Sequence, residues 1–293
     1  MRFLFLDIMK IRFLILFLLT YLASAICHSQ PAQDSVYNLY SVFMKSVNEV
    51  KKIDNCKKFS DGLKHVLDMN KSNEFVFDSL KKYKVMIESP DKQLRVFTWD
   101  MEFEDGTHTY YGFIQAYNKK SKKFEVYPLN DKSGVIKDPE NANLDNTKWF
   151  GAYYYQIIQM KKKKNKYYVL LGWNGNNRIT NKRLIDVLYF NEKGFPKFGD
   201  AIFTAEDGKI KKRIIFEYQA GIFMSLRYDE EKQAILFDHL SPANPNLEGQ
   251  FQFYGPDFTY GMMEFKDRKW LYFKNANPRN DKDKTDKHFH EPY

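Results

Sequence analysis

The chain has 293 residues, of which 43% are hydrophobic and 28% are charged, and its formal net charge is +9. This hydrophobic content argues against a wholly disordered chain, and a mean hydropathy of −0.59 argues against a protein with many membrane spans. Aromatic residues make up 17% of the chain, and because they favour pleated strands, a β-rich fold is expected.

Residues 1–25 have the pattern of a secretory signal peptide. Lys10 and Arg12 precede an uncharged run of 15 residues, 13–27, and Ala23-Ser24-Ala25 supplies the small residues of a cleavage site. The run is short for a membrane-spanning helix, so an uncleaved anchor is the less favoured alternative.

Cleavage after Ala25 would remove three basic residues and one acidic residue, which leaves a net charge of +7. We therefore expect an exported protein, periplasmic or associated with the cell surface, and not transmembrane once the signal is removed. Nucleic acid is then the least expected partner, and an envelope glycan or another envelope protein is the favoured one. Cys27 and Cys56 both remain after cleavage, and an oxidising compartment permits a disulfide between them.

Residues 26–83 are expected to form a helical segment, because apolar residues recur there at intervals of three or four. The first such stripe is Val36, Leu39, Tyr40, Phe43, Val47 and Val50, and the second is Phe59, Leu63, Val66 and Leu67. The polar faces of these helices mix acidic residues with lysine. Packing against the rest of the protein is therefore preferred to binding at a membrane surface.

Residues 84–274 are expected to form one β-rich domain, because the period of the apolar residues changes to two. In the run 95–103, Trp99 and the apolar residues at every second position share one face, which predicts a half-buried strand. Asn174-Gly175 is a strong signal for a tight turn. Further strands are predicted at 107–117, 124–129, 151–160, 167–173, 184–190, 213–218, 222–228, 234–240, 258–265 and 269–274.

Many short strands joined by short turns indicate an antiparallel meander, so the fold is predicted to be mainly β with an N-terminal helical segment. A sandwich and a barrel-like sheet both satisfy this pattern. A small propeller is the less favoured architecture, because no repeat of fixed length is found. The polar stretch 130–148 is predicted to be a long loop, and 275–293 a polar tail.

No catalytic signature stands out in the sequence, and catalytic residues cannot be assigned from it. The motifs H-E-x-x-H, G-x-S-x-G and G-x-G-x-x-G and the Walker loop are all absent, and neither a cofactor nor a metal site is predicted. Carboxylates in or beside the predicted strands are numerous, but nothing selects the two that a glycosidase would need.

Six residues are the candidates for ligand binding: Trp99, Trp173, Asp238, His239, Tyr254 and Asp257. Asp238 and His239 end a predicted strand, where an acid and a histidine could take part in acid–base chemistry. Adjacent strand residues point to opposite faces, so the two are expected to bond other groups rather than each other. Exposed aromatic residues could stack on sugars, although two covered sheet faces would explain the aromatic runs as well.

Several segments between residues 90 and 280 together resemble one family. They are LRVFTWD (94–100), WFGAYYYQII (149–158), LLGWNGNN (170–177), KKRIIFEY (211–218), SLRYDEEKQAILFDHLSP (225–242) and GQFQFYGPDFTYG (249–261). The chain is similar in them to exported, function-unassigned β-rich proteins of Bacteroidetes-type Gram-negative bacteria. The resemblance implies a secreted β-rich protein, and it brings no catalytic residue with it.

The sequence thus favours an exported envelope protein that binds a glycan or another protein without catalysing a reaction. A hydrolase that acts on envelope glycans or peptides is one alternative. A structural partner of an outer-membrane complex is the other.

Overall fold

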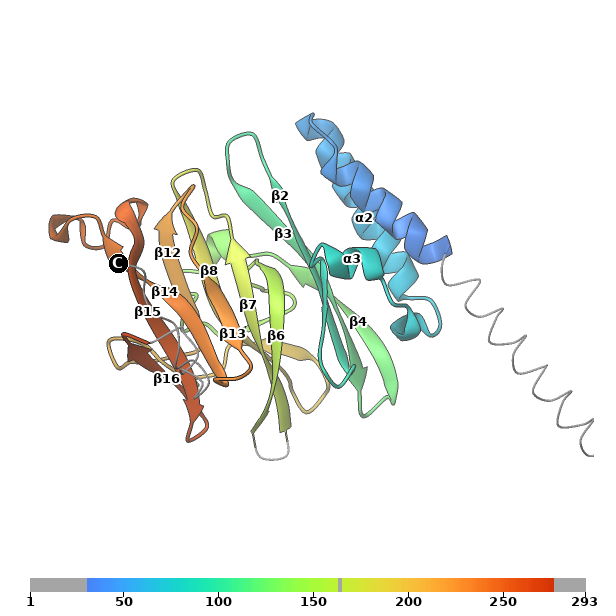
Figure 1. Ribbon diagram of the computed structural model, residues 1–293. Coiled ribbons are helices and arrows are strands. Elements are labelled where there is room, and N and C mark those ends of the chain that lie inside the picture. Colours follow the sequence, from blue (N-terminus) through green and yellow to red (C-terminus); the bar gives the residue numbers. More distant parts are fainter. Residues whose placement is uncertain (1–30, 163–164, 277–293) are drawn as a thin grey trace, which may run out of the picture. The chain divides into compact units, whose positions relative to one another are not determined.

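A computed structural model describes residues 31–162 and 165–276, and the chain divides into two compact units at Tyr83 (Figure 1). The first unit is helical and the second is built from strands, which confirms a mainly β fold with an N-terminal helical segment. The predicted signal peptide and most of the predicted polar tail lie outside the described residues.

The helical unit contains a helix over residues 31–44, α2 (Glu49–Leu67), the 3-10 turn η1 (Ser72–Glu74) and α3 (Asp78–Lys82). Within the described ranges, no helix is both long and apolar enough to cross a membrane. Cys56 is buried in α2 and Cys27 lies outside the described residues, so the disulfide stays a prediction.

The first apolar stripe is interrupted, and the prediction that it forms one helical face is wrong. Asn48 starts α2, because its side chain accepts a hydrogen bond from the Lys51 N–H and so caps the new helix. Val47 and Val50 lie at this break and are exposed, whereas the earlier members Val36, Tyr40 and Phe43 are buried. The second stripe, Phe59, Leu63, Val66 and Leu67, is buried as predicted.

The strands form three sheets, whose described pairs are antiparallel except for β10 with β16. The N-terminal sheet has the order β1 (Met86–Glu88), β2 (Leu94–Glu102), β3 (His108–Asn118), β4 (Lys123–Asn130). The central sheet has the order β5 (Leu144–Asp145), β9 (Pro196–Phe198), β8 (Thr180–Phe190), β7 (Asn165–Asn174), β6 (Tyr153–Lys162), and β12 (Ile214–Gln219) also pairs with β8. The C-terminal sheet has the order β11 (Ile210–Lys211), β10 (Phe203–Thr204), β16 (Lys269–Lys274), β15 (Tyr254–Lys266), β14 (Ala234–Pro242), β13 (Leu226–Asp229). Short 3-10 turns complete the connections: η2 (Ser133–Val135), η3 (Pro245–Leu247) and η4 (Phe251–Phe253).

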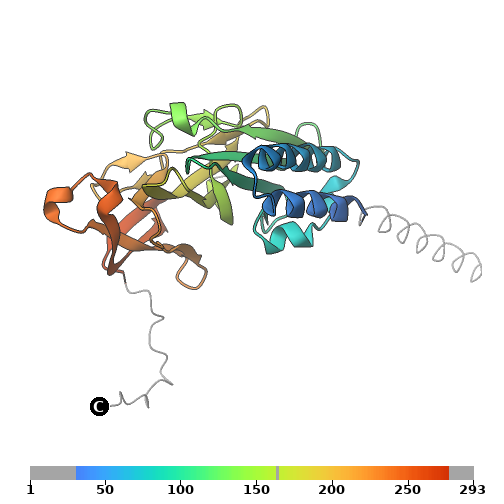
Figure 2. The same cartoon turned by 90° about the horizontal axis from the view of Figure 1, so that it is seen from above.

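The central sheet lies between the other two and is covered on both faces (Figures 1 and 2). Tyr168 and Leu170 of β7 pack toward the N-terminal sheet, whereas Val169 and Leu171 pack toward the C-terminal sheet. Because both sides of the strand need apolar residues, β7 reads as a continuous apolar run. The arrangement is that of a β-sandwich, and the described strands form no closed barrel.

Three details of the predicted strand pattern are corrected. β2 is buried along both faces for most of its length, so it is not half-buried. The connection between β7 and β8 is longer than a tight turn, because it runs over residues 175–179. In it the Gly175 N–H donates to the Tyr110 hydroxyl, and the Asn177 Oδ1 accepts from the Thr180 N–H. The predicted loop 130–148 contains β5, and the sequence pattern predicts none of β1, β9, β10 and β11, because two or three residues cannot show a period.

A buried ion pair lies in the central sheet, between Asp186 of β8 and Arg213 just before β12. The Arg213 Nε lies 2.8 Å from the Asp186 Oδ2, and both side chains are fully buried. The Tyr154 hydroxyl donates to the same Asp186 oxygen at 3.0 Å, and the Trp149 indole donates to Tyr154 at 3.2 Å. Burial raises the pKa of the Tyr154 hydroxyl well above its ordinary range, and the Asp186 charge adds to the shift.

We expect Arg213→Met to lower the free energy of unfolding by about 3–5 kcal/mol, because it leaves the Asp186 carboxylate buried without its cation. The double variant Asp186→Leu with Arg213→Met should recover most of that loss, since it leaves no buried charge. Urea denaturation of the three proteins measures both effects. A loss below about 1 kcal/mol in the single variant would contradict this account of the pair.

Candidate functional site

The pairing of β14 with β15 is interrupted by a wide bulge at His239. Asp238 pairs with Tyr260 and Leu240 pairs with Pro256, so three residues of β15, 257–259, lie opposite His239 alone. Bulges turn side chains out of the regular alternation of a strand and are common beside functional sites. Here the bulge brings the His239 ring and the Asp257 carboxylate together.

Asp257 is held in place on both of its oxygens. Its Oδ1 accepts hydrogen bonds from the Thr259 N–H at 3.0 Å and from the Thr259 hydroxyl at 2.7 Å, and its Oδ2 lies 2.6 Å from the His239 Nδ1. Burial alone would raise the pKa of Asp257. The contacts with Thr259 and His239 outweigh burial and hold the pKa below its usual value.

The other ring nitrogen of His239 faces a second carboxylate. Its Nε2 lies 3.5 Å from the Glu206 Oε1, and the Lys274 ammonium is 3.0 Å from the same oxygen. Burial would raise the pKa of Glu206, but the contacts with Lys274 and His239 lower it overall. The imidazole ring therefore lies between two carboxylates, each of which has a further donor.

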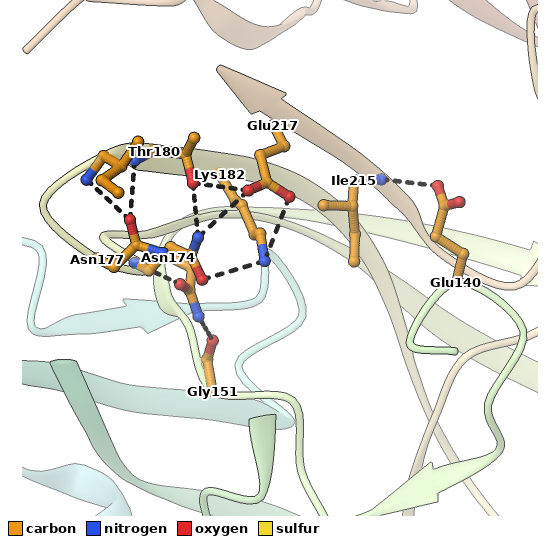
Figure 3. Close-up of polar contacts among 10 residues, drawn as sticks. Glu140, Gly151, Asn174, Asn177, Thr180, Lys182, Ile215 and Glu217 are labelled. Atoms are coloured by element: carbon orange, nitrogen blue, oxygen red, sulfur yellow. Dashed lines mark hydrogen bonds and ion pairs between the residues drawn. The ribbon is translucent and has the colours of Figure 1, made fainter. Parts of the chain in front are cut away.

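Beside His239 lies a cavity of about 150 Å³ with an apolar side and a polar side. Phe216 and Phe237 form the apolar side, with ring centroids 4.8 Å apart. On the polar side, the Glu140 Oε2 is 2.6 Å from the Lys211 ammonium. The Glu140 Oε1 accepts a hydrogen bond from the Ile215 N–H of β12 at 3.2 Å (Figure 3).

Phe258, at the middle of the bulge, has a strained backbone and an exposed ring. Its φ is 66°, in the left-handed region that bulky residues avoid, and its side chain is 94% exposed. Neither feature stabilises the fold, because no apolar surface is buried in return for the strain. We call Glu206, His239, Asp257 and Phe258 the bulge site.

A second polar cluster is formed by the ends of β8 and β12, and it has a structural role (Figure 3). The Glu217 carboxylate accepts hydrogen bonds from the Thr180 hydroxyl at 2.6 Å and from the Asn176 amide at 3.3 Å, and it lies 3.4 Å from the Lys182 ammonium. These contacts occupy Glu217 and fix the connection between β7 and β8. The cluster therefore accounts for its own polar groups without a ligand.

The structure brings together three of the six predicted ligand-binding residues. Asp238 and His239 line the cavity and Asp257 contacts His239, while Asp238 itself accepts from the Ser225 N–H at 2.7 Å. Asp238 and His239 thus bond other groups, as the alternation of a strand predicts.

The other three predicted residues lie elsewhere or are already engaged. Trp99 is buried and stacks on Tyr111 with ring centroids 5.9 Å apart. Trp173 and His108 form a T-shaped pair with ring centroids 5.5 Å apart. The Tyr254 hydroxyl accepts from the Gly249 N–H at 2.9 Å and closes its own loop.

Sequence reasoning missed Glu206, Glu140 and the exposure of Phe258. The only signal for Phe258 is its place in the aromatic run 254–260. Glu206 precedes an Asp-Gly turn and carries no sign that it will meet His239. Among the described residues, no group of three or more histidines, cysteines and carboxylates is arranged to hold a metal ion.

We expect Phe258→Gly to raise the free energy of unfolding by up to about 1 kcal/mol, because glycine adopts a positive φ without strain. Thermal unfolding measured by circular dichroism tests this. A loss of more than about 1 kcal/mol would mean that the ring stabilises the fold and is not held for another purpose.

The contact of Asp257 with His239 should depend on pH. A carboxyl group whose pKa is lowered by folding stabilises the fold above its ordinary pKa, about 3.9, and this stabilisation is lost as the pH falls through the lowered value. Asp257→Asn should therefore lower the free energy of unfolding by about 1 kcal/mol at pH 7, and the difference should shrink as the pH falls through the lowered pKa. If the difference persists in acid, the carboxylate charge is not its cause.

The bulge site is defined by the geometry of this chain alone. Comparisons with protein-family models, with curated proteins and with solved structures each found no match.

Proposed function

We propose that the protein is exported and that it binds a neutral glycan of the cell envelope at the bulge site, without catalysing a reaction. The observation that carries this proposal is Phe258, whose ring is 94% exposed on a strained backbone directly beside Asp257. An exposed aromatic ring next to fixed polar groups matches the two kinds of surface on a sugar. The C–H face of a sugar ring stacks on an aromatic ring, and its hydroxyl groups bond carboxylates and imidazole.

The charges around the site support a neutral ligand rather than a charged one. Glu206 lies against Lys274 and Glu140 against Lys211, so these charges already have partners of opposite sign, and the Asp257 carboxylate already bonds Thr259 and contacts His239. A charged ligand would have to displace one of these partners. A hydroxyl group can add to an ion pair without breaking it, since carboxylate oxygens accept more than one hydrogen bond.

The same geometry favours binding over hydrolysis. A general base needs a free ring nitrogen near the proton it removes, but both nitrogens of His239 face carboxylates. A glycosidase needs two carboxyl groups placed on either side of the scissile bond, whereas Asp257 and Glu206 lie on either side of an imidazole ring. Neither arrangement supports the alternative of an envelope hydrolase.

Export to the envelope rests on the sequence pattern of residues 1–25 and on the resemblance to exported proteins, and both stay predictions. An exported protein would share a compartment with the glycans of the cell envelope. The N-terminal residue of the secreted chain, read from its mass, tests this part of the proposal independently of binding.

The labelled full chain should bind neutral glycans on a microarray that also carries acidic and amino glycans. In calorimetry with the strongest neutral glycan, Phe258→Ala should weaken binding about tenfold, because it removes the stacking ring. His239→Asn should weaken it by a similar factor, because the acid–imidazole contacts that shape the cavity are lost.

Two matched variants serve as controls. Phe195→Ala removes another exposed phenylalanine, and His65→Asn removes an exposed histidine of α2. Both should bind as the unchanged chain does. If no neutral glycan binds, or if Phe258→Ala binds as tightly as the controls, the proposal is wrong.

A further inference from the structure

A second hollow, of about 490 Å³, lies where edge strands of three sheets meet. β1 ends the N-terminal sheet, β6 ends the central sheet and β13 ends the C-terminal sheet. We call this hollow the edge groove. Its polar lining is Asp91, Gln156, Gln159, Tyr228, Glu230 and Gln233.

Two glutamines of β6 join it to the flanking segments through their side chains. The Gln159 side chain accepts from the Asp91 N–H at 3.3 Å, and the Gln156 side chain accepts from the Tyr228 N–H at 3.0 Å. Between these two contacts, the residues from Gln156 to Gln159 pair with β7 on one side only.

The outer edge of this four-residue segment offers unpaired backbone groups. In an antiparallel strand, alternate residues direct their N–H and C=O groups away from the partner strand. None of the described residues pairs with this edge through a backbone hydrogen bond. An open strand edge is a template for another extended chain, and proteins normally cover it when it has no use.

The charge of the edge groove is opposite to that of the whole chain. Its lining includes two carboxylates and no basic side chain, whereas the chain carries a net charge of +9. Asp91 is paired with Lys166, whose ammonium lies 2.6 Å away. Glu230 forms no ion pair with any described residue, so it is available to a cation.

We propose that the edge groove binds an extended peptide segment carrying lysine or arginine, which adds as a strand to the open edge of β6. The peptide backbone would supply the N–H and C=O groups that this edge lacks. Ile158 packs toward the C-terminal sheet and Ile157 toward the N-terminal sheet, so side chains of the added strand would alternate between the same two sides. Glu230 directly follows β13 and so lies on the side of the C-terminal sheet, where a lysine or arginine of the added strand would pair with it.

The chemistry selects a peptide rather than a sugar, because a sugar has no repeating donors and acceptors at the spacing of a strand. The edge groove shares no residue with the bulge site, so peptide binding and glycan binding can be tested independently of each other.

Calorimetry of the full chain with a blocked hexapeptide of alternating lysine and valine tests the proposal. The peptide should bind, and the same peptide N-methylated at every residue should bind at least about tenfold more weakly, because it cannot donate to the strand edge. Hydrogen exchange of the backbone amides at 156–159 should slow when the unmethylated peptide is present. Equal binding of the two peptides, or protection elsewhere, would overturn the proposal.

Paired charge variants separate a specific contact from general attraction. Glu230→Lys should weaken binding about fivefold, whereas Glu192→Lys, which makes the same change at an exposed turn, should leave it unchanged. An equal effect of both variants would overturn the proposal. So would self-association of the free chain through 156–159, detected by sedimentation and amide protection, because the occupant would then be a second copy.

Discussion

Tyr168 and Leu170 of β7 face one neighbouring sheet, and Val169 and Leu171 face the other, so both faces of the central sheet are covered at β7. This double burial constrains everything attached to the sheet. Asp186 points into one of the two cores and remains there only because Arg213, Tyr154 and the Val187 N–H contact its carboxylate. Many of the aromatic side chains are buried in the same two cores.

Because the sheet faces are used for packing, surfaces that could bind ligands arise where the strand ladder is broken or ends. The bulge opposite His239 is a break, and the open side of β6 is an end. In both places a side-chain oxygen accepts a hydrogen bond from a backbone N–H that has no partner strand. Asp257 accepts from the Thr259 N–H, and Gln156 accepts from the Tyr228 N–H. These side chains keep irregular backbone in one conformation, which a binding surface needs.

Features with a short period could be predicted from the sequence, and features set by long-range register could not. Strand-like apolar runs predicted β2, β6, β7 and β8, and the alternation of side chains along a strand predicted that Asp238 and His239 would not bond each other. It could not show that three residues of β15 would oppose His239, because the register of that bulge depends on pairing at both of its ends. The partner Glu206 is 33 positions away, and no local pattern links it to His239.

The expectation of a half-buried β2 failed for a related reason. Alternating apolar and polar residues predict that the face containing Thr98 is exposed to solvent. Thr98 is nevertheless buried, because its hydroxyl accepts a hydrogen bond from the Tyr154 N–H. Whether a polar residue faces water or a partner is decided by elements far along the chain. In the helical unit, Asn48 caps the start of α2 and so interrupts the first apolar stripe. An N-cap residue is a local signal, but the regular spacing of Val47 and Val50 with the earlier apolar residues suggested one continuous helix.

The central claim is that the bulge site, and not another part of the surface, contacts the ligand. Titration of the ¹⁵N-labelled full chain with a pool of neutral oligosaccharides, followed by amide chemical shifts, tests it most directly. The account predicts that the largest shifts fall on residues 257–259 and His239, which the bulge brings together. Shifts confined to other surfaces, with these four residues unmoved, would contradict it.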